Sequence, residues 1–563
     1  MIMSVYDVTM RPLMAAAKHV KPIKKAEFAS SLLRLFDFKI PRAFGIALSG
    51  GVDSMCLAYL SDAFAREHGT TVFAFTVDHK LRDDSSAEAK SISNVLTTQF
   101  EDPDAHIRHE VLELDWKYAD KSPHVIERTA RTLRYRALAK ACVKNRIEHL
   151  LLAHNLDDQI ETVIMRLLRG STSRGMAGMR RVSWIPEGHS TYGGHHVKIL
   201  RPLLLEPKVR LIATCLGAQL PWFEDMTNHD PTYTKRNAVR YLLSQPEKLP
   251  LALRPQNLAP LCERLSDKRR QADRAGLRLF KYEVDNGNIR FSRPSMTVVW
   301  KMRSEAYEGM DINSLASFIQ RLVNMVTPLD LSDISSRRYR EVVTKLLNRT
   351  ETTFTFMNIQ WTHSTKTVTR SPRVRPAYLN AEPNAEKLMA SPFGAHKLQS
   401  EKMAKSRFSL KVNRPNVKEE KQEEVVEHHW TLARQRIPAF NQPAVVVMVP
   451  PSGWSDWKLW DGRMWIRLRW ENKKDGPAPK PVVIRPFSDM DRNTISKFGP
   501  AVERTFLAKA RVINGLDLFT LPVLHDPELA RMIAMPNLKF CIGPRELLVE
   551  STPKNQDILT DRR

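Results

Sequence analysis

The sequence predicts an α/β fold, a doubly wound and mostly parallel sheet, followed by a helical domain and a C-terminal α+β domain. Three observations support this fold class. Strand-length apolar runs alternate with helical patterns from residue 43 to about 225, helical spacing dominates 236–281 and 312–349, and strand patterns return beyond 428. Alternation of the first kind requires crossover connections, which make the connected strands parallel. At 563 residues the chain is long enough for several domains.

The first domain is expected over residues 43–235. Its strand-length apolar runs are AFGIAL (43–48), TVFAFTVDH (71–79), IRHEVLEL (107–114), HLLLAH (149–154) and VKILRPLL (197–204). Its helical patterns fall near 53–67, 85–100, 127–144, 157–169 and 206–218. Because such sheets bind ligands at the carboxyl ends of their strands, the residues that follow these runs are the first candidates for a functional site.

The rest of the chain divides by composition. Residues 1–42 are basic and poor in acidic residues, which is typical of a mitochondrial targeting segment or of a simple amphipathic helix. Residues 236–370 are expected to be mainly helical, with a hairpin signalled by the Asn-Gly of KYEVDNGNIRFS. Residues 371–427 are rich in Pro, Lys, Glu and Asn, which predicts a flexible charged linker or an exposed insertion on a folded domain. Residues 428–550 are expected to form the C-terminal domain.

The net charge points to the kind of partner. A formal charge of +25 and an isoelectric point near 9.9 favour a polyanion, because each neutralised phosphate releases counterions. The alternative is that the basic residues only keep the surface solvated. The longest apolar stretches, such as AVVVMV (444–449), are far below the ~20 residues of a membrane span, so no membrane partner is expected. The five cysteines are far apart, which excludes CxxC spacing and indicates a reduced, intracellular protein.

The stretch FGIALSGGVDS (44–54) places Ser-Gly-Gly between a strand and a helix. A helix N-terminus presents unpaired N–H groups, and a phosphate reaches them only where the turn carries almost no side chain. No Lys follows, so this is not a Walker A loop, and the turn suits cleavage between α- and β-phosphates. Ser54 can add a hydroxyl donor, and Asp53 either holds Mg²⁺ or closes the turn. The alternative is an ordinary strand–helix turn capped by Asp53.

The SGGVDS motif resembles that of the N-type PP-loop ATP pyrophosphatases, and further motifs narrow the resemblance to tRNA(Ile)-lysidine synthetases. In chain order these are TVDHKLRDDSSAEA (76–89), IERTARTLRYRAL (126–138), LLAHNLDDQIETVIMRLLRGSTSRGMAGM (151–179), ILRPLL (199–204) and FEDMTNHDPTYTKRNAVR (223–240). The resemblance is strong over about 45–245. It is weaker for WDGRMWIRL and LPVLHDPELARMIAMPNL near the C-terminus.

This resemblance implies an ATP-dependent carbon–nitrogen ligase. Such an enzyme adenylates the wobble cytidine of an isoleucine tRNA with a CAU anticodon, and the ε-amine of free lysine then displaces AMP to form lysidine. Mg²⁺ would neutralise the polyphosphate. The helical and C-terminal domains are expected to hold the tRNA body through Lys and Arg contacts to phosphates.

The resemblance also implies roles for individual residues. The implied ATP-binding residues are Ser49, Gly50, Gly51, Val52, Asp53, Ser54, Asp78, His79 and His154. Catalytic roles are implied for Asp53, Asp158, Glu161 and Arg236, with Asp53 and Asp158 as the candidate Mg²⁺ ligands. Contacts to lysine or tRNA are implied for Glu127, Arg131, Arg134 and Asn237.

Structural alternatives stand beside several of these roles. Asp158 and Glu161 lie three apart at a helix N-terminus, which is also the spacing of a capping box. Asp78 and His79 could simply end a strand, and His154 could simply pack. The charged residues of IERTARTLRYRAL (126–138) could form an ion-paired helix face. GSTSRGMAG (170–178) is either a mobile loop over the anticodon or an ordinary connector.

Two other functions remain open at this point. One is a tRNA-binding protein whose PP-loop ATPase is inactive, and the other is a different PP-loop enzyme that modifies tRNA. KRNAVR stands where many relatives carry PRN, which leaves the shape of that loop open. The charged linker and the basic N-terminus favour a mitochondrial matrix protein, with the cytoplasm as the alternative.

Overall fold

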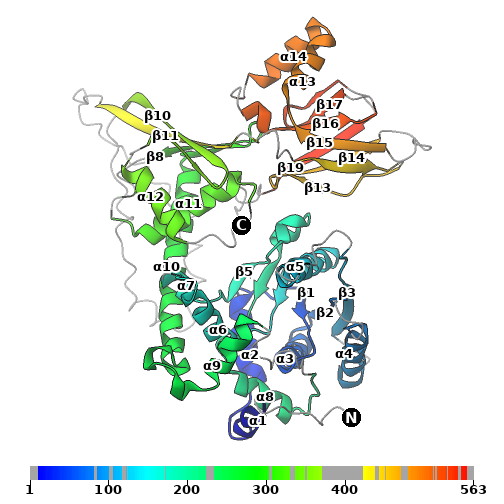
Figure 1. The fold of residues 1–563 in the computed structure, drawn as a ribbon, viewed down its shortest axis with the longest axis vertical. Coiled ribbons are helices and arrows are strands. Elements are labelled where there is room, and N and C mark those ends of the chain that lie inside the picture. The colour runs from blue at the N-terminus through cyan, green and yellow to red at the C-terminus, as the bar shows by residue number, and fades with distance from the viewer. Residues whose placement is uncertain are drawn as a thin grey trace, which may run out of the picture.

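The computed structural model describes most of the chain. The described residues are 10–80, 85–100, 106–116, 122, 125–171, 173–223, 234–302, 307, 309–329, 336–348, 351–370, 423–435, 437, 443–450, 452–470, 480–511, 513, 517–528, 531–542 and 547–554. Figure 1 shows an N-terminal domain, a middle domain reached along the long helix α10, and a C-terminal domain beside the middle one. Among the described residues, no helix is long and apolar enough to cross a membrane.

A six-stranded sheet forms the centre of the N-terminal domain. Its strands are β1 (Ala43–Ala47), β2 (Thr71–Asp78), β3 (Ile107–Glu113), β4 (His149–Leu151), β5 (Val182–Trp184) and β6 (Lys198–Leu200). Their order is β3-β2-β1-β4-β6-β5, and every pair is parallel except β5 with β6. The predicted doubly wound, mostly parallel sheet is therefore confirmed. The direction of winding reverses between β1 and β4, which is where such sheets bind ligands.

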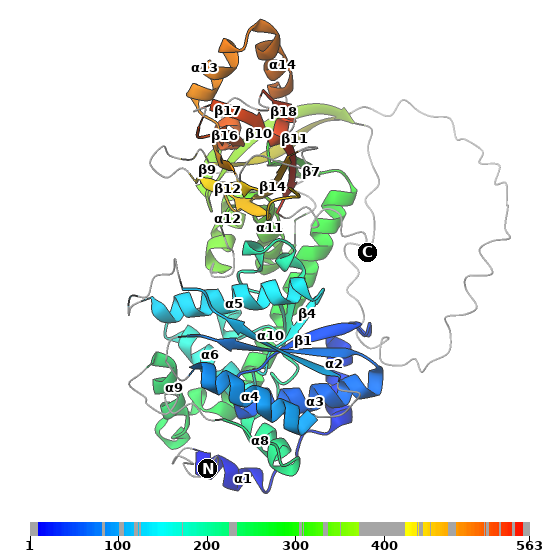
Figure 2. The same ribbon diagram turned by 90° about the vertical axis from the view of Figure 1, so that its right-hand side faces the viewer.

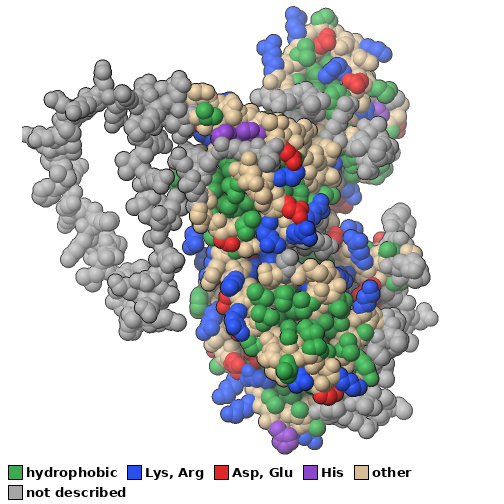
Figure 3. Space-filling view, turned by 60° about the vertical axis from the view of Figure 1, so that its left-hand side comes forward, with side chains coloured by type: hydrophobic (Ala, Val, Ile, Leu, Met, Phe, Trp, Pro, Cys, Tyr) green, Lys and Arg blue, Asp and Glu red, His purple; other side chains and the backbone are tan. Residues whose placement is uncertain are grey.

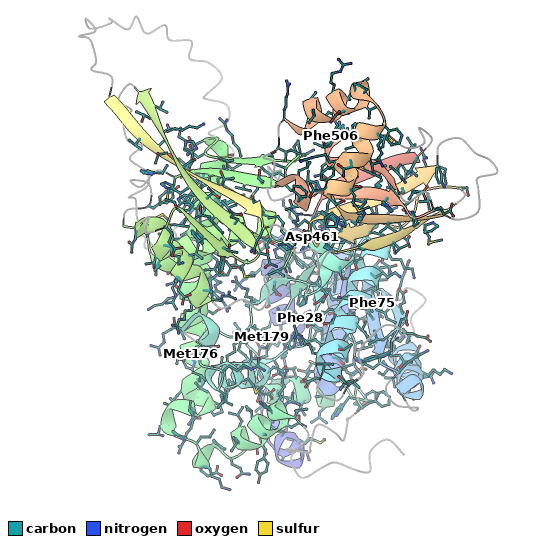
Figure 4. The ribbon with its side chains drawn as sticks, turned by 45° about the horizontal axis from the view of Figure 1, so that its top comes forward. Phe28, Phe75, Met176, Met179, Asp461 and Phe506 are labelled. Carbon is teal, nitrogen blue, oxygen red and sulfur yellow. The ribbon has the colours of Figure 1, made fainter. Side chains whose placement is uncertain are left out.

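Helices cover both faces of this sheet (Figure 2). The helices of this domain are α1 (Met10–Ala17), α2 (Lys25–Leu35), α3 (Val52–His68), α4 (Ser85–Phe100), α5 (Ile126–Lys144), α6 (Leu156–Leu167), α7 (Ser173–Met176), α8 (Lys208–Gly217) and α9 (Lys235–Leu243). Short 3₁₀ turns occur at Gly188–Ser190 and Gly194–His196. One core packs α2, α3 and α8 against the sheet and includes Phe28, and the other packs α5 and includes Phe75. Both phenylalanines are labelled in Figure 4.

The described residues before β1 belong to this domain. Phe28, Leu32 and Phe36 are buried in the core beneath the sheet, and Ile23 N donates to Thr214 Oγ1 of α8 at 2.9 Å. The structure thus differs from the expected boundary at residue 43, because the apolar face of α2 is needed to cover the sheet. Residues 1–9 lie outside the described part.

The middle domain combines helices with a sheet. Short turns at Pro246–Lys248 and Leu251–Leu253 lead into α10 (Pro255–Asp285), followed by β7 (Ile289–Ser292), β8 (Thr297–Met302), α11 (Ile312–Val326), α12 (Ser336–Asn348), β9 (Thr353–Phe356), β10 (Ile359–Arg370) and β11 (Glu423–Arg434). The sheet is antiparallel in the order β7-β8-β11-β10-β9. Its buried face contributes Trp300, Trp361 and Trp430 to a core shared with α11 and α12. The predicted hairpin at Asn286-Gly287 lies between α10 and β7, and β7 pairs with β8 instead.

The β10–β11 pair shifts the expected boundaries. Thr362 pairs with Thr431 and Arg370 with Glu423, so residues 423–434 complete the middle sheet and do not begin the C-terminal domain. Trp430 and Leu432 alternate with polar neighbours and face the core, which fixes this register. Of the predicted linker, residues 371–422 lie outside the described part.

The C-terminal domain has two antiparallel sheets and a helical hairpin. One sheet has the order β12-β15-β16-β17-β18 and the other β13-β14-β19. The elements are β12 (Val445–Val449), β13 (Lys458–Trp460), β14 (Met464–Trp470), β15 (Lys480–Pro486), α13 (Asp489–Lys497), α14 (Pro500–Ala510), β16 (Pro522–Asp526), β17 (Arg531–Met535), β18 (Phe540–Cys541) and β19 (Leu547–Pro553), with 3₁₀ turns at Asp517–Thr520 and Pro536–Leu538. Apolar residues of both sheets meet in one core. The expected α+β architecture is present.

Candidate active site

The glycine turn lies at the carboxyl end of β1. Gly50 has φ +79°, and a Cβ there would come within 2.8 Å of the Ile92 side chain. Gly51 has φ −69°, and a Cβ there would have its nearest neighbour at 3.8 Å. Gly50 is therefore required by backbone conformation and packing, whereas a Cβ at Gly51 would make only ordinary van der Waals contacts. Without that Cβ, an anion can approach the N–H groups at the start of α3 more closely.

Ser49 and Ser54 stabilise the turn from within. Ser54 Oγ donates to Gly51 O at 2.9 Å and accepts from Ser49 N at 3.2 Å. Ser54 was expected to supply a donor for phosphate, but in this structure its hydroxyl closes the turn. The Gly51 position has no side-chain cap, and Val52 packs into the core. The first-turn N–H groups of α3 are thus not capped by a side chain.

Asp53 carries an unpartnered acceptor in this site. Its Oδ1 is buried and has no hydrogen-bond partner among the described residues, and its side chain hydrogen-bonds that of Asn155. Burial raises the pKa of Asp53 to about 6, an effect that Lys208 opposes and Asp158 reinforces. A buried carboxylate oxygen without a donor is what a Mg²⁺ ligand requires. No group of three or more metal-ligating side chains occurs in the described part of the chain, so phosphate and water oxygens would complete the coordination.

The start of α6 follows β4 at the same edge of the sheet. Asn155 is the N-cap, its Oδ1 accepts from Asp158 N at 3.0 Å, and Asp158 Oδ2 accepts from Asn155 N at 3.1 Å. A capping box exists, but it pairs Asn155 with Asp158 rather than Asp158 with Glu161. Asp158 Oδ1 and the Glu161 carboxylate are left for other partners. Asp157 Oδ2 accepts from Lys208 N at 2.7 Å and points away from them to α8.

Two arginines of α9 bind these carboxylates. Arg236 donates from Nη2 to Asp158 Oδ1 at 2.8 Å and from Nε to Glu161 Oε2 at 2.7 Å. Arg240 donates from Nε to Glu161 Oε1 at 2.7 Å. Burial lowers the pKa of Arg236, but Glu161 and Asp158 outweigh this and raise it. We call these four residues the carboxylate–arginine network.

Sequence reasoning missed Arg240. The signal was available, because Arg236 and Arg240 are four apart in KRNAVR and lie on one face of a helix. Asn237, expected to bind lysine or tRNA, is buried, and its N–H donates to Thr234 Oγ1 at the start of α9.

His154 lies behind the network. Its Nδ1 accepts from Arg201 Nε at 3.2 Å. Burial, with a further effect of Arg201, lowers the pKa of His154 to about 3. The imidazole is therefore neutral near pH 7 and cannot supply a proton there. Arg201 is itself buried and also donates to Arg180 O and to Ser183 Oγ.

Asp78 and His79 lie at the carboxyl end of β2, beside the glycine turn in strand order. Asp78 is buried and accepts from Lys80 N at 3.0 Å, and Trp116 Nε1 donates to His79 O at 2.7 Å. These contacts organise the end of the strand. A contact of Asp78 and His79 with the nucleotide stays a prediction.

The charged residues of α5 face the site from the other side of the sheet edge. Glu127 and Arg131 are exposed, and no ion pair joins these two within the described residues. Arg131 and Arg134 instead lie over the Tyr135 ring, at 5.0 and 5.3 Å from its centroid. The charge of Glu127 acts on Arg236, and that of Arg134 on His154. The charged side chains of α5 thus act electrostatically on the network and on His154 from nearby.

Comparison with known proteins finds relatives of the N-terminal part of the chain. Residues 24–247 match the family model described as a PP-loop domain. The chain is 37% identical over 228 residues to a protein of Schizosaccharomyces pombe named as a probable tRNA(Ile)-lysidine synthase, a match that covers 40% of this chain and 49% of that one. It is 38% identical over 224 residues to the tRNA(Ile)-lysidine synthase of Rhodopseudomonas palustris, covering 39% and 59%. The chain thus spans about half the length of these relatives.

A solved structure, the U34-tRNA thiolase of Methanococcus maripaludis with its [4Fe-4S] cluster, is similar at a TM-score of 0.32 and 15% identity, covering 46% of this chain and 80% of that chain. A similarity this low carries no conclusion about fold or function.

Proposed function

We propose that this chain, whose residues 24–247 form a PP-loop domain, is a tRNA(Ile)-lysidine synthase. It would join free lysine to the wobble cytidine of a CAU-anticodon isoleucine tRNA at the expense of ATP. One observation carries the proposal. The glycine turn and the carboxylates of Asp53, Asp158 and Glu161 lie together at the switch point of the sheet, where they could bind a metal ion and an amine. The names of the relatives support the substrate pair.

The reaction needs two displacements. In the first, the 2-keto oxygen of the cytosine attacks the α-phosphorus of ATP and pyrophosphate leaves. In the second, the ε-nitrogen of lysine attacks C2, the bond from C2 to the adenylated oxygen breaks, AMP leaves, and the nitrogen loses a proton. An oxygen bound to AMP is a good leaving group, whereas a keto oxygen is not.

The chain's own residues divide this work. The N–H groups at the start of α3 would hold phosphate oxygens, with Gly51 leaving the approach open. Asp158 and Glu161 would attract the ε-ammonium of lysine and help to remove its proton, which is normally retained at pH 7 because the lysine pKa is about 10.4. Arg236 and Arg240 hold those carboxylates in place and would move toward phosphate oxygens as lysine arrives.

Mg²⁺ fits the site, because Asp53 Oδ1 lacks a donor and Asp158 acts on it from close by. Asp53, with Asp158 nearby, would hold the ion, which would neutralise the polyphosphate and polarise the reacting phosphoryl group.

The decisive experiment is incorporation of labelled lysine into a CAU-anticodon isoleucine tRNA transcript with ATP and Mg²⁺. A methionine tRNA transcript with the same anticodon is the control. Lysine transfer to the isoleucine transcript alone is the expected result. Release of AMP and pyrophosphate without lysine transfer would mean that another nucleophile is used, and tRNA binding without either would make this a tRNA-binding protein with an inactive site.

A mitochondrial matrix location is also proposed, on the basic N-terminus. Because Phe28 and Leu32 of α2 are buried in the core, any targeting segment that is removed should end before α2. N-terminal sequencing of the mature protein tests this, and a mature start inside α2 would contradict the packing.

A further inference from the structure

A cluster of arginines lies where α6, α7, α10 and α11 meet. Within the described residues its members are Arg166, Arg174, Arg180, Arg269 and Arg321, grouped around Asp273. Arg174 Nη2 lies 2.6 Å from Asp273 Oδ1, and Arg180 Nη1 contacts Asp273 Oδ2. We call this group the arginine cluster. One carboxylate cannot neutralise so many guanidinium groups.

Backbone carbonyls bind part of the cluster. Arg166 Nη1 donates to Gly175 O at 3.0 Å and to Gly178 O at 2.7 Å, and Arg269 Nη1 donates to Gly178 O at 2.7 Å. Arginines of α6 and α10 thus bind the Gly175 and Gly178 carbonyls of the glycine-rich segment. Met176 and Met179, labelled in Figure 4, mark this segment between the middle domain and the N-terminal sheet. The carbonyls satisfy N–H groups but do not remove the excess positive charge.

Several donors in the cluster have no acceptor. Arg269 Nε and Arg321 Nε are buried without a hydrogen-bond partner among the described residues. The hydroxyl of Tyr339 in α12 is buried and also lacks a partner there, with the residue 3% exposed. Burial, and then Arg180, lower the pKa of Arg269 to about 9. Arg174 lies close enough to Tyr339 to act on the pKa of its hydroxyl, which burial raises. Buried donors left unpaired are costly, so the site fits a group that brings negative charge and several acceptor oxygens.

We propose that the arginine cluster binds a phosphate group of the RNA backbone. Phosphate offers the charge and the multiple acceptors that planar guanidinium groups match best. Arg180, whose side chain is 43% exposed, connects the cluster to the surface. On the face drawn in Figure 3, Lys and Arg side chains gather around the middle of the molecule.

The position of the cluster favours RNA over a free anion. Arg166 follows Glu161 by five residues on α6, which is about 8 Å along the helix axis. Because five residues also turn by about 140° around the axis, a phosphate held there would lie on another side of α6 from the network, and it would belong to the same strand a few nucleotides from the reacting one. This inference rests on the proposed function, and it names the contact that positions the substrate.

The test measures binding of the full chain to an unmodified CAU-anticodon isoleucine tRNA transcript between about 50 and 200 mM salt. Arg321→Gln removes a guanidinium that has no described ion pair, so the fold should persist. We expect affinity to fall about tenfold and the slope of log K against log salt to fall by about 1. Arg66→Gln on α3, which removes a half-exposed arginine paired with Asp62, is the matched control and should leave both unchanged.

Tyr339→Phe gives a second, charge-neutral variant. Loss of an unpartnered buried hydroxyl should not lower the melting temperature, but tRNA affinity should fall severalfold. If both variants bind tRNA like Arg66→Gln, the proposal is overturned. It is also overturned if inorganic phosphate stabilises the wild type but not Arg321→Gln while tRNA binding is the same in both, since the site would then hold a free anion. Lysine transfer by the wild type is measured separately, so failure of the proposed activity is distinguishable from failure of this contact.

Discussion

The glycine turn and the carboxylate–arginine network lie at the same edge of the sheet, but they are assembled in different ways. The turn is defined by the consecutive residues 49–54, where Ser54 Oγ accepts a hydrogen bond from Ser49 N and donates one to Gly51 O. The network joins α6 to α9 across 75 and 79 residues of chain. The turn requires glycine at positions where a Cβ would interfere. The network requires charged carboxylate and guanidinium groups to be brought together from distant parts of the chain. The two should therefore respond differently to substitution.

The largest effects are expected in the turn, and its two glycines should separate stability from activity. Gly50→Val adds atoms 2.8 Å from Ile92 in a backbone conformation with φ +79°, and should destabilise the protein by about 3 kcal/mol and abolish activity. Gly51→Ala meets no atom closer than 3.8 Å and should leave the melting temperature unchanged while lysine transfer falls by about 100-fold. Thermal unfolding and lysine transfer measure the two effects. Full activity of Gly51→Ala would mean that phosphate does not approach here.

Removal of one charge from the network is the next largest effect. Asp158→Asn keeps an acceptor for Asn155 N, so the start of α6 should survive, but lysine transfer should fall by about 1000-fold while tRNA still binds. Arg240→Gln leaves Arg236 on both carboxylates and should cost about tenfold. Single-turnover lysine transfer and tRNA binding are the measurements. Parallel loss of tRNA binding and helix content in Asp158→Asn would indicate that the residue acts mainly as a cap.

Asp53 lies in the glycine turn and is influenced by Asp158 of the network, and its effect should depend on pH. Because its pKa is raised to about 6 in the folded protein, the folded state holds this proton more tightly than the unfolded chain, whose pKa is near 3.8. The resulting loss of stability is absent below about pH 3.8, grows up to about pH 6 and is complete above it. Asp53→Asn should thus stabilise the protein by at most about 3 kcal/mol at pH 7.5 and not at pH 3.5.

Denaturant unfolding at the two pH values measures this effect. Mg²⁺ should stabilise the wild type and not Asp53→Asn, which gives a readout independent of activity. An equal gain at both pH values would show that titration of Asp53 is not the cause.

The same contrast explains what the sequence could and could not predict. The parallel strands, the glycine turn and the residues after β4 were recognisable because each is encoded in a few neighbouring residues, whereas the three-residue antiparallel strand β5 was not predicted. The capping box was displaced by one turn, because Asn155 and Asp158 both suit an N-cap and only the backbone decides between them. Only part of the middle sheet could be predicted, because β10 and β11 pair across residues 371–422. The arginine cluster was missed for a similar reason, as its members come from four helices and from the connection before β5.

The smallest effect is expected at Asp157. This residue is adjacent to Asp158, so the two substitutions can be compared directly. Asp157 is exposed and only accepts from Lys208 N, so Asp157→Asn keeps the acceptor and loses a charge near a helix N-terminus. Such a charge contributes about 0.5 kcal/mol, and activity should stay within about twofold of the wild type. Lysine transfer and thermal unfolding, run beside Asp158→Asn, measure both effects. If the two variants lose activity equally, negative charge at the start of α6 is what matters, and the specific pairing of Asp158 with Arg236 is not.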